Sequence, residues 1–136
     1  MTRAAIDTGA LLALASSRDQ HHERAVATEA RFRTAGGRWA GTMLVLAELH
    51  GHLVRRADPA TARRVISALL KDPAYEWRDA TMELVDAAIR GWLERFADQR
   101  FTLTDAVTFE LMRRERVRYA FAFDADFVVA GFELLE

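Results

Sequence analysis

Residues 3–15 read RAAIDTGALLALA and decide the fold that the rest of the chain has to complete. The run at 3–7 is short and apolar, as is typical of a buried strand, and it ends on an acid, Asp7. Thr8 and Gly9 then open a leucine-rich run at 10–15 that predicts a helix. The stretch therefore indicates a strand that leads directly into a helix, with a carboxylate at the junction.

Short apolar stretches alternate with helical patterns along the rest of the sequence. Parallel strands need crossover connections and are covered on both faces, so this order predicts an α/β fold, a three-layer α/β/α sandwich around a central, mostly parallel sheet. Further strands are expected at 39–42, 75–78, 119–123 and 132–135, and helices at 20–35, 43–57, 59–71, 81–97, 104–117 and, as a short turn, 125–129.

The composition excludes several classes of protein. The chain has 136 residues, of which 51% are hydrophobic and 29% charged, with a net charge of −1, so we expect a single domain over residues 1–136. The absence of cysteine excludes thiolate nucleophiles, disulfides and cysteine-ligated zinc. The apolar run at 10–15 is far shorter than the ~20 residues that span a bilayer, and no basic segment precedes it. We therefore expect a cytoplasmic protein without a membrane partner.

Four acids stand at positions where a solvated surface would not require them. In a parallel sheet, ligands gather at the carboxyl ends of the strands, and the pattern places Asp7 and Asp124 there. Asp105 falls in the first turn of a helix, and Glu48 is the sole acid in the apolar run MLVLAEL at 43–49. Each acid also has an ordinary interpretation, as a strand-end cap, a first-turn helix acid or a helix acid that faces solvent.

Convergence of these acids in space would carry a large electrostatic cost. Two unit charges ~4 Å apart repel by about 4 kcal/mol at an effective dielectric constant near ~20, and further pairs add to this energy. Such a cluster needs shared protons or a divalent cation. Carboxylate ligands without cysteine favour Mg²⁺ or Mn²⁺, bound through one or two carboxylates and several waters.

Four short segments carry a resemblance to a known family: IDT at 6–8, LAEL at 46–49, LTDAVTF at 103–109 and FDADF at 123–127. In this order and spacing, the chain resembles the PIN-domain ribonucleases that occur as VapC-type toxins in bacterial and archaeal toxin–antitoxin pairs, from about residue 6 to residue 132. The resemblance implies a PIN-like fold, Mg²⁺- or Mn²⁺-dependent endoribonuclease activity on RNA, a homodimer, and a small antitoxin protein as partner.

The resemblance also implies roles for individual acids. The family's four catalytic acids correspond to Asp7, Glu48, Asp105 and Asp124. Of these, the three aspartates are expected to bind the metal, with Asp126 as a supplementary ligand. Glu48 is expected to position water or to act as general base.

Several other residues bear on the predicted site, and each has its own interpretation. Ala122 stands where many relatives carry threonine or serine, which removes one expected polar contact near the metal or the scissile phosphate. Thr8 is expected to hydrogen-bond the acids or a phosphate, and Thr104 to cap a helix. Unstacked bases could rest on Tyr75, whereas Trp39 is better explained by core packing.

Arginine is the other residue type that RNA binding would use here. The guanidinium group suits phosphate, and a run of arginines follows Asp105 on or just beyond its helix. We therefore expect Arg113, Arg114 and Arg116 to contact phosphates that flank the cut bond. A solvated helix face is the alternative interpretation of these arginines.

Two other classes of function fit parts of the pattern. Response-regulator receivers and haloacid-dehalogenase-like phosphatases also gather aspartates at strand ends, but both resemblances expect a lysine near the site. The single lysine, Lys71, lies at the end of a helix remote from the acids, and the stretch at 7–9 lacks the second aspartate of the phosphatase motif. A non-catalytic PIN-scaffold module that binds protein or RNA would be expected to have lost acids, and none is lost.

Overall fold

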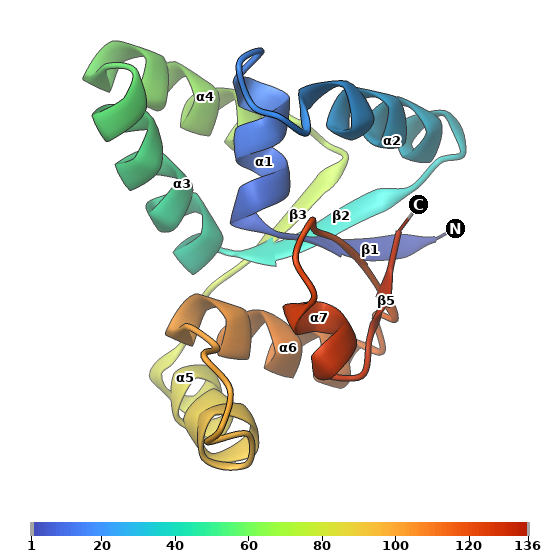
Figure 1. Ribbon diagram of the computed structural model, residues 1–136, viewed down its shortest axis with the longest axis vertical. Coiled ribbons are helices and arrows are strands. Elements are labelled where there is room, and N and C mark those ends of the chain that lie inside the picture. The colour runs from blue at the N-terminus through green and yellow to red at the C-terminus, as the bar shows by residue number, and fades with distance from the viewer. Residues whose placement is uncertain (1, 136) are drawn as a thin grey trace.

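The sheet at the centre of the molecule is parallel throughout. The computed structural model describes residues 2–135, and within them five strands follow the order β3-β2-β1-β4-β5, with every pairing parallel (Figure 1). The predicted central sheet is confirmed. The strands are β1 (Arg3–Ile6), β2 (Arg38–Thr42), β3 (Tyr75–Arg78), β4 (Tyr119–Phe121) and β5 (Glu133–Leu134).

Helices cover both faces of the sheet and complete the three layers expected from the sequence. In Figure 1 the first four helices lie above the strands and the later ones below. Among residues 2–135, no helix is both long and apolar enough to cross a membrane. The upper layer holds α1 (Thr8–Ala15), α2 (His22–Thr34), α3 (Met43–Arg56) and α4 (Pro59–Lys71), and the lower layer α5 (Met82–Ala88), the π-helical segment η1 (Ile89–Glu94), α6 (Leu103–Glu115) and α7 (Asp126–Val129).

Side chains of the central strand alternate between the two helical layers, as the two-residue period of a strand requires. Ala4 and Ile6 pack in the cluster under α1–α4, whereas Ala5 packs in the cluster on the α5–α7 side. All three are fully buried, which explains why β1 reads as an uninterrupted apolar run. Trp39 of β2 and Phe121 of β4 extend the first cluster, with ring centroids 5.2 Å apart.

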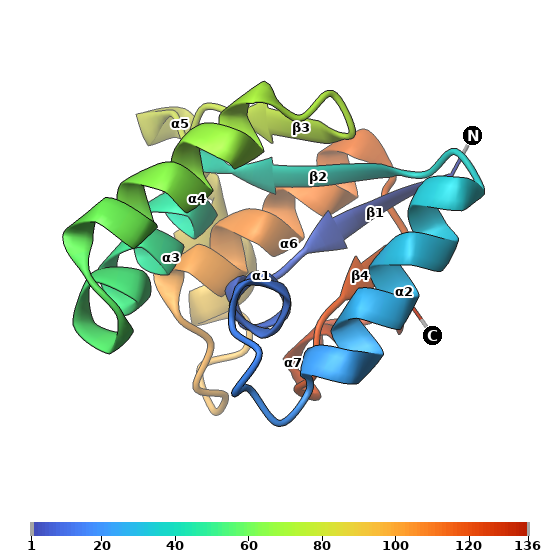
Figure 2. The same cartoon turned by 90° about the horizontal axis from the view of Figure 1, so that it is seen from above.

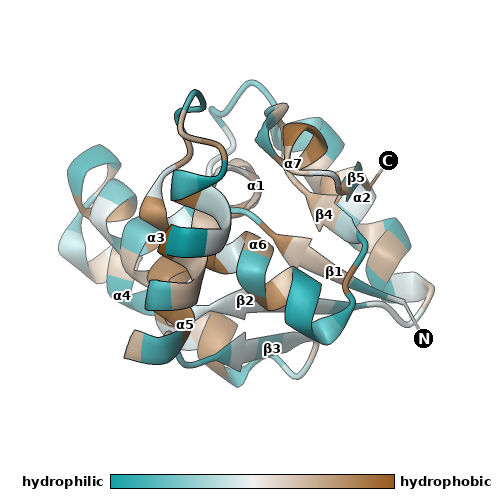
Figure 3. Cartoon of the chain, turned by 90° about the horizontal axis from the view of Figure 1, so that it is seen from below, coloured by the Kyte–Doolittle hydropathy of each residue, from teal (hydrophilic) through white to brown (hydrophobic). Residues whose placement is uncertain are grey.

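Helix α6 carries buried side chains along most of its length. The ring of Phe109 is fully buried and meets the rings of Phe101 and Phe127 edge-on, with centroids 5.0 Å apart in both pairs. Trp92 of η1 packs on the same ring at 5.3 Å. Figure 3 shows this layer from below, with α5 and α6 in front of the strands. This packing fixes the direction of α6 and therefore the position of its first turn.

The strand order changes direction beside β1. The chain passes from β1 to β2 on one side and later returns to place β4 on the other side, and such a point leaves a crevice at the carboxyl ends of the two strands. The backbone N–H of Asp7 donates to the carbonyl oxygen of Phe121 at 3.0 Å, which ties the end of β1 to the end of β4. Figure 2 shows β1 leading into α1, with β4 alongside β1.

The helix expected over 81–97 is only partly α-helical. It ends as a regular helix at Ala88, and residues Ile89–Glu94 form wider π-helical turns. In this arrangement the indole N–H of Trp92 donates to Glu110 Oε1 at 3.1 Å, across to α6. The buried carboxylate of Glu110 thus accepts a hydrogen bond from the π-helical segment, a contact that the apolar spacing of 81–97 does not indicate.

The cap of α6 also differs from the expected one. Thr102, not Thr104, is the N-cap, because its hydroxyl accepts from the backbone N–H of Asp105 at 3.1 Å. In return, the carboxylate of Asp105 accepts from the backbone N–H of Thr102 at 3.0 Å. This reciprocal pair is a capping box, which satisfies two helix-terminal donors at once.

Candidate active site

The five acids predicted from the sequence line one pocket at the carboxyl edge of the sheet. The pocket has a volume of about 290 Å³. Its walls come from the end of β1, the start of α1, one face of α3, the first turn of α6 and the segment after β4. Folding therefore brings together carboxylates that are far apart in the chain. The acids are Asp7, Glu48, Asp105, Asp124 and Asp126.

Regular elements hold the first three of these acids in place. Asp7 follows β1 and precedes α1, and its side chain makes no capping hydrogen bond to that helix, so the carboxylate remains available to the pocket. Glu48 lies in the second turn of α3, whose start is fixed by the hydroxyl of Thr42 accepting from the backbone N–H of Leu44 at 3.3 Å. Asp105 is the third residue of α6.

Two of the carboxylates are already bonded to backbone amides. Asp124 Oδ1 accepts from the backbone N–H of Asp126 at 3.0 Å, and Asp105 Oδ2 accepts from that of Thr102. In each case the hydrogen bond involves one carboxylate oxygen. The second oxygen of each group is therefore left for another ligand of the pocket.

Burial and like charges together change the ionisation of Asp7. Burial is the largest cause that raises the pKa of Asp7. The negative charges of Asp105 and Asp124, and more weakly that of Glu48, add to it and bring the pKa to about 7, against the backbone N–H of Thr8, which lowers it. The carboxylates are thus close enough to repel one another.

The same two causes act on other acids of the pocket. Burial raises the pKa of Asp105, although its hydrogen bonds with Thr102 lower it, and the charges of Asp126 and Asp124 raise it. Burial also raises the pKa of Asp126, again with repulsion from Asp124. A positive charge placed among these groups would therefore be strongly favoured.

The donor set suits a hard divalent cation, although the side chains are not closed around one. Among residues 2–135, no group of three or more His, Asp or Glu side chains is arranged so that it could hold a metal ion directly. Carboxylates repel one another when no cation lies between them, so they are most stable apart. The pocket also contains the hydroxyl of Thr8, which is buried without a hydrogen-bond partner. Oxygen ligands of this kind are those that Mg²⁺ and Mn²⁺ take, often through water, so the residues fit such an ion.

Three polar residues of the pocket were not predicted as part of the site. His52 lies four residues after Glu48 on α3, and that spacing places both on the same helix face. Thr102 contributes through the capping box described above. Arg100 reaches the pocket from the segment before α6, where no periodic pattern indicates its direction. The i, i+4 spacing from Glu48 could have indicated His52, but no sequence signal indicated Arg100.

The arginines expected to bind RNA lie away from this pocket. Helix α6 runs from the carboxyl edge of the sheet to the amino edge, and Arg113 is about 12 Å further along it than Asp105 at 1.5 Å per residue. Both Arg113 and Arg114 pair with Glu110, at 2.7 and 2.9 Å. Arg116 ends the helix in a left-handed conformation, with φ of 57°. RNA contact by these three residues stays a prediction.

The two aromatic residues considered for base stacking also lie outside the pocket. Trp39 is fully buried in the core, as its core-packing interpretation requires. Tyr75 is half-buried at the start of β3, and its ring stacks on that of Trp77 at 5.5 Å with an interplanar angle of 9°.

Comparison with known proteins gives curated relatives over part of the chain and similar solved structures over nearly all of it. No family model matches the chain. Over 41 residues the chain is 42% identical to the 23S rRNA-specific endonuclease VapC20 of Mycobacterium tuberculosis, in two strains of that organism. The matched stretch is 30% of this chain and spans about a third, 31%, of the length of those curated relatives.

Solved structures extend the similarity over nearly the whole chain. The crystal structure of M. tuberculosis VapC20, described as a sarcin–ricin loop cleaving toxin, matches with a TM-score of 0.82 and 27% identity over 95% of both chains. VapBC2 from Rickettsia felis, bound to a DNA fragment from its promoter, matches with a TM-score of 0.69 over 98% of this chain and 97% of that one. At 12% identity, the second match shows the fold alone. The chain thus has the PIN fold of the VapC proteins, and its sequence is similar to that of VapC20.

Proposed function

We propose that this protein is a metal-dependent endoribonuclease that hydrolyses RNA phosphodiester bonds. The observation that carries the proposal is the convergence of five carboxylates from distant segments in one pocket, where burial and their mutual repulsion raise the pKa of Asp7 to about 7. A fold has no structural need for such a repulsive cluster. A site that binds a divalent cation does need it.

The acids divide into two roles. Asp7, Asp105 and Asp124 hold the cation, with Asp126 as a supplementary ligand, directly or through water. When bound, Mg²⁺ or Mn²⁺ lowers the pKa of a coordinated water and offsets the charge that develops on the leaving oxygen. Glu48, on the α3 wall of the pocket, orients the attacking water and accepts its proton.

The biological role that we propose is that of the toxin in a toxin–antitoxin pair. The names of the similar proteins support it, since VapC20 is described as a ribosomal RNA endonuclease and toxin and VapBC2 was crystallised on promoter DNA. A cognate antitoxin protein, a homodimer and a cytoplasmic location belong to the same proposal. These elements rest on the resemblance to the family rather than on contacts within this chain.

A direct test uses the purified protein and a defined RNA. Wild-type protein should cleave the RNA with Mn²⁺ or Mg²⁺ and lose the activity in excess chelator. The Asp124→Asn variant should fold but not cleave, whereas Asp79→Asn, which alters an exposed aspartate outside the pocket, should cleave as the wild type does. Cleavage that survives chelation, or that Asp124→Asn leaves intact, would refute the proposal.

The phosphotransfer alternative lacks a structural basis. Lys71, the single lysine of the chain, is the last residue of α4 and is not among the residues that line the acid pocket. A non-catalytic binding module remains the competing class of function, and the cleavage experiment separates it from a nuclease.

A further inference from the structure

A second hollow lies beside the acid pocket. Its volume is about 320 Å³, and it lies between α2 on one side and the segments around β4 and β5 on the other. Phe123 lines this hollow and Asp124 lines the acid pocket, so two consecutive residues form the boundary between them. We call this hollow the α2 groove. It is lined by Arg24, Ala27, Thr28, Arg31, Phe121, Ala122, Phe123, Leu134 and Leu135.

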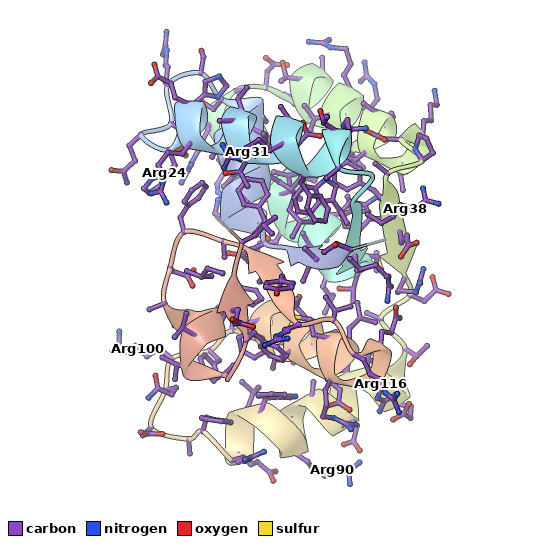
Figure 4. The ribbon with its side chains drawn as sticks, turned by 90° about the vertical axis from the view of Figure 1, so that its right-hand side faces the viewer. Arg24, Arg31, Arg38, Arg90, Arg100 and Arg116 are labelled. Carbon is purple, nitrogen blue, oxygen red and sulfur yellow. The ribbon has the colours of Figure 1, made fainter. Side chains whose placement is uncertain are left out.

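Two arginines of the α2 groove are available to a ligand. Arg24 and Arg31 are both exposed, and their seven-residue spacing puts them on one face of α2, about 10.5 Å apart along the helix axis. Within residues 2–135, neither forms an ion pair or a hydrogen bond to an acid. By contrast, Arg33 on the same helix pairs with Glu29 and Asp72, at 2.6 and 2.9 Å. Figure 4 shows Arg24 and Arg31 on α2, with Arg90 at the opposite end of the molecule.

The wall between the groove and the acid pocket is aromatic. The imidazole of His21 stacks on the ring of Phe123, with centroids 4.3 Å apart and an interplanar angle of 10°. The guanidinium carbon of Arg24 lies 5.2 Å from the centroid of the same ring. Cations beside planar rings are the combination that binds single-stranded nucleic acid without reading its sequence.

We propose that the α2 groove holds the single-stranded RNA on one side of the cut bond, with Arg24 and Arg31 on its phosphates and the His21–Phe123 pair beside a base. The inference rests on the proposed ribonuclease function and names where the substrate leaves the acid pocket. The position of the groove favours RNA over an acidic protein segment. A scissile phosphate bound among the acids would lie next to Phe123, which precedes Asp124 in the chain and lines the groove. Charge favours it as well, since no acid is among the described residues that line the groove.

The test compares RNA binding and cleavage by Arg24→Ala/Arg31→Ala with those of the wild type. The probe is a short unstructured oligouridine, bound by the inactive Asp124→Asn protein with and without the arginine pair. Removal of two phosphate contacts from a single strand should reduce the slope of log K against log salt by about 1.4 and weaken binding roughly tenfold. In the active protein, KM should rise while kcat at saturation changes little.

Two matched variants make the result specific. Arg90→Ala removes an exposed arginine that pairs with an exposed acid, Asp86, at 2.9 Å, and it should leave both the slope and KM unchanged. Arg24→Lys/Arg31→Lys keeps the charges and should retain most of the salt dependence. A circular dichroism melt confirms that each variant is folded.

The outcomes separate this inference from the function on which it rests. If the wild type cleaves RNA and the double alanine variant has the same KM and the same salt slope, the groove does not bind RNA, and the proposed activity still stands. That result would leave the groove to a protein partner. If the wild type neither binds nor cleaves RNA, the proposed function and this inference both fail.

Discussion

Replacement of Asp7 by asparagine should stabilise the metal-free protein above neutral pH. The carboxyl group of Asp7 is half-buried beside three other acids, and its pKa is raised from 3.8 to about 7. Asparagine keeps the shape of the side chain without its charge. The variant therefore removes the cost of burying a negative charge and of placing it beside the other acids of this pocket.

The magnitude follows from linkage between proton binding and folding. Because the folded-state pKa lies above the unfolded one, the protonated carboxyl contributes stability that is fully present below about pH 4 and is lost as the pH rises through about 7. The difference of about 3 pH units, at about 1.4 kcal/mol for each, amounts to roughly 4 kcal/mol. Relaxation of the side chain makes this figure an upper bound.

Urea unfolding in excess chelator at about pH 5 and about pH 8 measures this effect. The free energy of unfolding of the wild type should fall between these two pH values by up to about 3 kcal/mol more than that of Asp7→Asn, because only about two pH units of the shift lie in this range. Asp79→Asn, at an exposed position outside the pocket, should follow the wild type. Addition of Mn²⁺ at the higher pH should stabilise the wild type and not Asp7→Asn. Parallel pH dependence in wild type and Asp7→Asn would refute the electrostatic account of the site.

Four further substitutions test the site and its scaffold. Asp105→Asn should abolish RNA cleavage while leaving the thermal midpoint in chelator unchanged or raised; a lower midpoint with cleavage intact would make the residue structural. Glu110→Ala should destabilise the fold by about 2 kcal/mol or more in urea unfolding, since it leaves the Arg113 guanidinium and the Trp92 indole N–H without their acceptor and removes one of the two acids that pair with Arg114; a neutral effect would show that this ion network contributes nothing. Asp58→Ala should lower the urea midpoint in the same assay through loss of the α4 cap, and an unchanged midpoint would contradict a capping role. Arg113→Ala/Arg114→Ala tests the RNA contact expected from the sequence, because a lower salt slope of RNA binding would support it and an unchanged slope would exclude it.

The layers and the sheet could be predicted because each strand carries a strong local pattern. The run before Asp7 is apolar without alternation, as a strand covered on both faces must be, and helices follow it with regular apolar spacing. The π-helical turns at Ile89–Glu94 could not be predicted. The apolar stripe of Leu84, Ala88 and Trp92 fits a regular helix equally well, and the acceptor of the Trp92 indole, Glu110, lies on another helix where the local pattern does not indicate it.

The convergence of the acids on one pocket could be predicted because three of them, Asp7, Asp105 and Asp124, stand at a recognisable strand end or helix start, and Glu48 is the sole acid of an apolar run. The arginine contacts could not, since the partners of a guanidinium group are set by tertiary packing. Arg114 pairs with Glu83, which lies 31 residues earlier in the chain, as well as with Glu110. Glu110 itself is nearly fully buried in the middle of α6, and hydrogen bonds from Arg113, and then from Arg114 and Trp92, hold its pKa at about 2. Sequence periodicity contains no signal for a charged residue of this kind.

The backbone N–H of Asp7 donates to Phe121, so the rate at which this amide exchanges its proton should report unfolding of the whole sheet. β1 is bonded on both edges, to β2 and to β4, so deuterium can replace the amide proton of Asp7 only when the sheet itself comes apart. Slow exchange at this position should therefore persist in chelator even as the carboxylate side chains move freely. The Asp7 carboxylate is thus attached to the end of the central strand, and it can reorient around a bound ion without any loosening of the peptide framework that carries it.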